Sequence, residues 1–285
     1  MTKTLDTLIP DIYSMLEQGT DVEQPHVKEA LDEVGGLVRE AVEIILREGQ
    51  RTGVSNLRLS AIGKPDRQIW YGAKGEEGES INGQTKIKFL MGHVLEALLI
   101  CLTKAAGHEV TEAQDTVEVE GVLGHQDCRI DGWLVDIKSA SSFAFKKFKE
   151  GTLSEDDSFG YIPQISAYAT RHGDKQAAFF AIDKNSSELT ILKVHDMEMI
   201  DAPARVRHLK GVVNSEQVPE RCYSDVADGA SGNRKLAIGC VFCSYKKKCW
   251  SDANGGKGLR AFQYSNGVRY LTTVAKTPNV DEVDL

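Results

Sequence analysis

Apolar residues recur every three or four positions in several stretches of the chain. Residues 5–50 show this spacing on both sides of a break at 19–21. A period near 3.6 predicts two amphipathic helices there. Residues 86–106 predict a third helix, which is apolar nearly all round, so we expect it to be buried. Residues 160–172 predict another helix.

The pattern changes to strand-like runs between residues 115 and 141. Asp131-Gly132 separates two such runs, and an Asp-Gly pair in this position is a strong β-hairpin signal. Residues 177–182 and 189–195 predict two further strands, whereas 72–84 and 146–158 predict loops. The order of helix, hairpin, helix and strands predicts an α/β fold.

Composition narrows the class of protein. The chain has 285 residues, 41% of them hydrophobic, which is typical of a globular protein. Its 34 basic and 42 acidic residues give a net charge of −8, which excludes a basic protein that coats nucleic acid but leaves room for a local basic groove. The N-terminal residues lack the pattern of a signal peptide, and Glu96 interrupts the most apolar stretch. We therefore expect a cytoplasmic protein without a membrane partner.

The hairpin brings acidic residues together. A two-residue turn at Asp131-Gly132 places Asp127 opposite Asp136. It also places His125 opposite Lys138, with all four side chains on one face. Facing carboxylates repel unless one is protonated or a cation lies between them, and Mg²⁺ or Mn²⁺ prefers such oxygen ligands. The alternative is an ordinary solvated strand face with alternating charges.

Two helices carry polar pairs at helical spacing. His93 and Glu96 are three residues apart on the apolar helix, and Gln164 and Tyr168 are four apart on the later one. A buried carboxylate requires a metal ion or a lysine nearby. A satisfied core histidine with a glutamate at its edge is the alternative explanation of the first pair.

These residues occur in a recognisable order. Gly92-His93-x-x-Glu96, Gly124-x-x-Asp127, Asp136-x-Lys138 and Gln164-x-x-x-Tyr168 together resemble the PD-(D/E)XK nuclease superfamily. The chain is most similar to its RecB-type branch, which includes CRISPR-associated RecB-like exonucleases and their phage relatives. The resemblance covers residues 58–250 and implies a restriction-endonuclease-like core, in which helices flank a central mixed sheet.

The resemblance also implies roles for single residues. His93, Asp127 and Asp136 would bind Mg²⁺ or Mn²⁺, assisted by the carbonyl group of Ile137. Lys138 would be the catalytic lysine. Glu96 would be an acid beside the metal site, and Gln164 and Tyr168 would position DNA or the lysine.

Four cysteines gather near the C-terminus. Cys240-x2-Cys243-x5-Cys249 resembles the final cysteine group of the same branch. Iron–sulfur members carry one more cysteine upstream of the core, where this chain has Pro65, so Cys222 is the natural fourth ligand. We favour a [4Fe–4S] cluster over Zn²⁺, which four thiolates would also suit. Cys101 and Cys128 lie alone and are not expected to be ligands.

The chain therefore divides into a helical segment (1–52), a nuclease core (53–215) and a cysteine module with a tail (216–285). We expect a metal-dependent deoxyribonuclease, by analogy an exonuclease, that acts in DNA replication, recombination, repair or phage DNA processing. In a virus, the host cytoplasm would be its location. Replication or recombination proteins are possible partners besides DNA.

Three other functions stay open. They are a DNA endonuclease, a DNA-binding recombination partner without catalysis, and a zinc-binding interaction protein. Basic segments at 146–149 and 246–248 could flank a nucleic-acid groove, with Phe148 and Tyr245 available to stack on bases. Ordinary solvated charge is the alternative explanation of both segments.

Overall fold

The structure is a computed structural model that describes residues 2–47 and 56–284. The described residues form two compact units. The first contains residues 2–47, 57–63 and 81–208, and the second contains 56, 64–80 and 209–284. Residues 64–80 thus group with the C-terminal unit and not with the core where the sequence analysis placed them. The expected boundary between residues 52 and 53 lies outside the described residues.

A mixed sheet of five strands, in the order β1-β4-β5-β6-β7, forms the centre of the first unit. β5 and β6 are parallel, and the other neighbours are antiparallel. A parallel pair needs a crossover, which α5 and α6 supply. The strands are β1 (Val110–Thr111), β4 (Cys128–Ile130), β5 (Trp133–Ala140), β6 (Gln176–Asp183) and β7 (Leu189–His195). A separate ribbon pairs β2 (Thr116–Val119) with β3 (Val122–His125).

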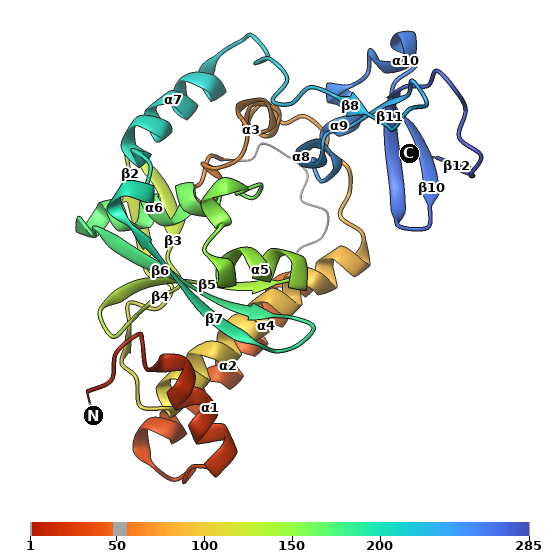
Figure 1. Cartoon of the computed structure of the whole chain (residues 1–285). Coiled ribbons are helices and arrows are strands. Elements are labelled where there is room, and N and C mark those ends of the chain that lie inside the picture. Colours follow the sequence, from red (N-terminus) through yellow and green to blue (C-terminus); the bar gives the residue numbers. More distant parts are fainter. Residues whose placement is uncertain (1, 48–55, 285) are drawn as a thin grey trace. The chain divides into compact units, whose positions relative to one another are not determined.

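Helices cover both faces of this sheet (Figure 1). α1 and α4 pack on the face formed by alternate residues such as Val135, Ile137 and Phe180. α5 and α6 lie on the other face, where Phe148 contacts Phe179. The helices of this unit are α1 (Leu8–Gln18), α2 (Pro25–Arg47), α4 (Gly83–Ala105), α5 (Ser142–Glu150), α6 (Tyr161–His172) and the first part of α7 (Ala202–Asn214). Short 3-10 turns occupy Leu59–Ala61, Leu153–Glu155 and Asp196–Glu198.

The second unit is built from short elements. Its sheet has the order β12-β10-β11-β9-β8. The strands are β8 (Val226–Ala227), β9 (Arg234–Lys235), β10 (Arg260–Tyr264), β11 (Gly267–Thr273) and β12 (Glu282–Val283). The helices are α3 (Asp66–Ala73), α8 (Ile238–Val241), α9 (Lys246–Cys249) and α10 (Ala253–Gly256). A small apolar cluster around Leu236 and Trp250 packs against some of them.

Several expectations from the sequence are confirmed. α1 and α2 lie within residues 5–50, and β6 and β7 occupy the two predicted strands. The Asp131-Gly132 turn joins β4 to β5 in the predicted register, with Ile130 paired to Trp133. Within the described residues no helix has the length and apolar character that crossing a membrane requires.

Two expectations are wrong. α4 is buried only in its C-terminal half, because Ile87, Phe89 and Met91 in its first turns are exposed. Residues 142–150, which overlap the predicted loop, form the amphipathic helix α5. Its lysines lie on the solvent side while Phe145 and Phe148 face the core, so the charge of the segment concealed the helical period.

A close glycine contact fixes the start of α6. A Cβ atom added to Gly63 would lie 2.4 Å from the Cα atom of Gly160, which itself has φ of 75°. Gly160 directly precedes Tyr161, the first residue of α6. Two glycines are therefore needed for the backbone to approach here.

We predict that Gly63→Ala destabilises the protein by about 1–3 kcal/mol, because a methyl group must displace backbone atoms. Urea unfolding measures the change. Gly83→Ala is the matched control, since an added Cβ at Gly83 meets nothing within 4 Å. Equal stability of the two variants would contradict the close contact.

Candidate active site and cysteine cavity

β5 carries the centre of the candidate active site. Asp136 is 1% exposed and forms an ion pair with Lys138, two residues further along the strand. Gln164 of α6 donates from Nε2 to Oδ1 of Asp136 at 3.2 Å. The same amide group lies 3.3 Å from the hydroxyl group of Tyr168. The two motifs recognised in the sequence therefore meet on the α6 face of the sheet.

Asp127 lies beside β5 but outside the strand ladder. The sequence analysis placed Asp127 opposite Asp136 in the hairpin. The β4–β5 pairing instead ends at Cys128 and Val135, so the two aspartates are not paired in the ladder. Oδ2 of Asp127 instead accepts the backbone N–H of Ile137 at 2.6 Å. The prediction for His125 is wrong, since His125 pairs with Thr116 in the β2–β3 ribbon and does not face Lys138.

The charges of this cluster act on one another. Burial and the negative charge of Asp136 raise the pKa of Asp127 well above its ordinary value. Burial also raises the pKa of Asp136, although Lys138 opposes that change. Burial alone would lower the pKa of Lys138, but the two aspartates outweigh it and raise that pKa. Lys138 is therefore an ammonium group in this form of the protein.

Glu96 belongs to the cluster, and His93 lies at its edge. The negative charge of Glu96 contributes to the raised pKa of both aspartates. Its Oε1 accepts from Gln114 Nε2 at 2.6 Å, and the backbone N–H of Gln114 donates to the Asp127 carbonyl at 3.0 Å. The His93 side chain is 58% exposed, with Nδ1 3.8 Å from Glu96 Oε2.

No three His, Cys, Asp or Glu side chains among residues 2–47 and 56–284 converge closely enough to hold one metal ion. The carboxylates of Asp127 and Asp136 are nevertheless suitable for a hard cation. Oδ2 of Asp136 is buried, and the ammonium group of Lys138 is its ion-pair partner. The carboxylates of the half-buried Asp127 and the buried Asp136, next to the backbone of Ile137, match the oxygen donors that Mg²⁺ and Mn²⁺ prefer.

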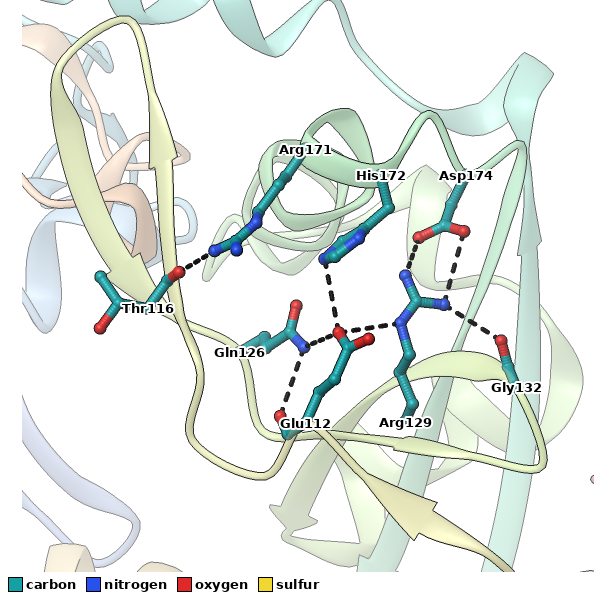
Figure 2. A network of polar contacts seen from close by, with 8 residues as sticks. All are labelled: Glu112, Thr116, Gln126, Arg129, Gly132, Arg171, His172 and Asp174. Carbon is teal, nitrogen blue, oxygen red and sulfur yellow. Dashed lines mark hydrogen bonds and ion pairs between the residues drawn. The ribbon is translucent and has the colours of Figure 1, made fainter.

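A network of polar contacts holds the segment that carries Asp127 (Figure 2). Glu112 accepts from Gln126 Nε2 at 3.0 Å and from Arg129 Nε at 3.1 Å. Arg129 also donates to Asp174, which follows α6, at 2.5 Å. Asp127 lies between two residues that this network fixes. The sequence analysis did not predict this network, because no sequence motif marks contacts between residues as far apart as Glu112, Arg129 and Asp174.

The four C-terminal cysteines line one cavity of about 30 Å³ in the second unit. That volume is about twice what one water molecule requires. Pro65, Tyr71 and Trp250 also line the cavity. Burial raises the pKa of Cys240 to about 11, and the other three cysteines add to the shift. Cys101 and Cys128 are buried in the first unit, as the sequence predicts for residues outside the cluster.

Several contacts bring Cys222 to the other three cysteines. Its sulfur accepts the backbone N–H groups of Arg67 and Gln68 in the first turn of α3. Arg221 stacks 4.2 Å from the ring centroid of Trp250 and donates to the Cys249 carbonyl at 2.8 Å. Cys222 and Pro65 thus line the same cavity.

The two basic segments do not form free cationic strips. In α5, Lys147 pairs with Asp156 and Lys149 with Glu188. In α9, Lys246 pairs with Glu79 and Lys248 with Glu76. Phe148 is 2% exposed, so its expected role in base stacking is wrong. Tyr245 packs on Tyr71 with ring centroids 5.4 Å apart.

Tyr161 is a residue of the site that the sequence analysis missed. Nζ of Lys138 lies 5.2 Å from the centroid of the Tyr161 ring. Tyr161 is three residues before Gln164 and seven before Tyr168, so the helical period of α6 places all three on one face. That spacing was the signal that could have identified it.

Comparisons with known proteins give distant structural likenesses. No family model matches the sequence, and no curated protein matches it. The crystal structure of SSO0001 is similar at a TM-score of 0.42 and 13% identity, over 74% of this chain and 93% of that one. An alkaline exonuclease from Laribacter hongkongensis is similar at a TM-score of 0.36 and 16% identity, over 55% of this chain and 84% of that one. At these scores the likenesses assign neither a family nor an activity.

We predict that Asp127→Asn stabilises the metal-free protein at pH 8. The raised pKa means that the folded chain holds this proton more tightly than the unfolded chain. The protonated Asp127 therefore contributes stability that is fully present below the ordinary pKa near 3.8 and is lost as the pH rises through the folded-state pKa. Asparagine keeps the neutral form, so the gain in melting temperature, measured in EDTA, should grow from pH 5 to pH 8.

Asp183→Asn is the control with the opposite sign. The backbone N–H of Asn185 and the hydroxyl group of Ser142 lower the pKa of Asp183. Its ionised form therefore stabilises the fold above pH 4 or so, and the variant should melt lower at pH 8. A lower melting temperature for Asp127→Asn in EDTA would refute the repulsion between the aspartates.

Proposed function

We propose that the protein is a Mg²⁺- or Mn²⁺-dependent DNA nuclease whose catalytic residues are Asp127, Asp136 and Lys138. The supporting observation is the meeting of a buried carboxylate, a half-buried carboxylate and an ammonium group beside one strand, with Gln164 donating to the buried carboxylate. Removing several charged side chains from water in one place costs free energy, and clusters of this kind are typical of functional sites. The order of the sequence motifs supports nuclease chemistry at this site and, by analogy, an exonuclease.

Asp127, Asp136 and the carbonyl group of Ile137 would hold the metal ion, and His93 could join them only if its exposed side chain turned inward. The ion would neutralise the scissile phosphate and lower the pKa of a bound water molecule. Gln164 keeps Asp136 oriented, and Ile137 does the same for Asp127 through its N–H group. Glu96 adds negative charge that favours a cation here.

Lys138 acts as a positive charge in this proposal. Because the aspartates raise its pKa, it holds its proton before the metal binds. An ammonium group can donate hydrogen bonds to a water molecule and to the charge that develops on phosphate oxygens. Tyr161 lies beside this group, and the buried Tyr168 helps to position Gln164 and, through it, Asp136.

We also propose that Cys222, Cys240, Cys243 and Cys249 hold a [4Fe–4S] cluster. All four line one cavity, yet no three of them are placed to hold a single ion. The resemblance of the cysteine spacing to the final cysteines of the RecB-type branch favours a cluster over tetrahedral zinc, which four thiolates would also suit. The buried Nε1 of Trp250 has no oxygen or nitrogen partner in the described chain and interacts with the Cys240 sulfur. An indole N–H group is a suitable donor to a thiolate ligand.

Incubation of end-labelled single- and double-stranded DNA with Mn²⁺ tests the nuclease. We expect cleavage by the wild type, and DNA binding without cleavage for Asp136→Asn. Lys138→Ala should lower the rate by about 10² or more with little change in metal affinity, because its charge acts on the reacting groups. Lys149→Ala, which removes a surface pair with Glu188, should cleave normally. Unchanged cleavage by a folded Asp136→Asn protein would sink the assignment.

Anaerobic purification tests the cluster. We expect a brown protein with a broad visible absorption band, and iron rather than zinc in elemental analysis. Serine at any of the four cysteines should remove the iron and destabilise the second unit, because ligand binding supplies folding free energy. Cys101→Ala in α4 should keep its iron. A colourless protein with one zinc per chain would support the zinc site instead.

A further inference from the structure

An exposed aromatic ring lies one ring away from the candidate active site. Phe159 is 58% exposed and stacks on Tyr161, with centroids 5.7 Å apart and ring planes inclined by 24°. Tyr161 in turn lies under the ammonium group of Lys138. A continuous series of side chains therefore leads from solvent through two rings to Lys138.

Phe159 stands on a rigid turn. Gly160, the next residue, is in close contact with Gly63. The carboxylate of Asp157 accepts the N–H groups of Tyr161 and Ile162 at 2.8 and 2.7 Å, which caps α6. The backbone on both sides of Phe159 is thus held in place, and binding of a ligand to this ring would require little ordering of the loop.

The surroundings of Phe159 suit a flat uncharged group better than a phosphate. The preceding residues include Asp156 and Asp157, whose charges are engaged by Lys147 and by the helix cap. Both side chains are carboxylates, so neither can bind a phosphate group. The aromatic ring does offer a π-face, which every nucleobase can stack on regardless of its identity.

We propose that Phe159 is a stacking platform for an unpaired base of single-stranded DNA next to the bond that is cleaved. The inference rests on the proposed nuclease function and specifies its substrate, because a base inside a duplex is covered by its stacked neighbours, whereas an unpaired base can turn a face onto this ring. Tyr161 supports the platform from below and separates it from Lys138. Stacking of the base on Phe159 positions the DNA strand, and the scissile phosphate binds at the site around Asp136.

Binding of a labelled single-stranded oligonucleotide to the full chain in EDTA tests the platform, since hydrolysis does not then interfere. Phe159→Ala should weaken binding about 5- to 30-fold, the lower part of the range for loss of one stacked base. The slope of affinity against salt concentration should not change, because no phosphate contact is removed. Phe143→Ala is the matched control: Phe143 is 78% exposed on α5 and should bind DNA as the wild type does.

Two further measurements separate stacking from a structural role. Phe159→Leu keeps an apolar cover over Tyr161 but has no π-face, so it should bind as weakly as Phe159→Ala, whereas Phe159→Trp should bind normally. An abasic nucleotide moved along the oligonucleotide should, at one position, remove the difference between wild type and Phe159→Ala. Wild-type affinity of Phe159→Leu, or no such position, would overturn the platform.

The cleavage assay in Mn²⁺ separates the two proposals. A wild-type protein that cleaves DNA while Phe159 shows no coupling to any base would leave the nuclease standing and refute the platform. A wild-type protein that binds single strands through Phe159 but cleaves neither substrate would refute the nuclease function alone. A protein that neither binds the oligonucleotide in EDTA nor cleaves DNA in Mn²⁺ would refute both.

Discussion

The repulsion between two neighbouring aspartates, the buried Asp136 and the half-buried Asp127, is the constraint on which the first unit depends. Each ionised carboxylate costs on the order of several kcal/mol to remove from water, and proximity to a second one adds to that cost. Lys138 offsets the charge of Asp136, and the N–H of Ile137 stabilises Asp127. A cation at this place would remove the remaining repulsion, so the same arrangement that is unfavourable in the metal-free protein favours metal binding.

The position of Asp127 explains why the sheet is irregular around it. Were β4 one residue longer, Asp127 would be a regular strand partner and its carboxylate would stand away from the backbone of β5. Ending the ladder at Cys128 frees the segment of Gln126 and Asp127, which the Glu112–Arg129 network then fixes. Because Arg129 also binds Asp174 after α6, the same network ties this segment to the helix that carries Gln164 (Figure 2). Both sides of the site are therefore positioned together.

Local chemistry made much of this fold predictable. The turn at Asp131-Gly132 needs positive φ at both residues, 49° and 82° here, and that requirement set the hairpin register from the sequence alone. The face of Cys128 followed from strand alternation. The predictions that were wrong concern features that depend on tertiary contacts. The lysines around Phe148 indicated a loop, but the sheet buries Phe145 and Phe148 between them, and Glu188, the partner of Lys149, lies far away in sequence. The exposure of the first half of α4 likewise depends on which elements cover it.

The cysteine cavity could be predicted only in part, for a related reason. The spacing of Cys240, Cys243 and Cys249 is a local signal, but the fourth partner is brought in by contacts of Arg221 and by the first turn of α3. Cys240 and Cys249 also pack against the small core around Leu236 and Trp250. In a unit with so few buried apolar side chains, the thiols are both candidate ligands and core residues. Their chemical state and the stability of the second unit are therefore coupled, because any group that binds the sulfur atoms also fixes the core beside them.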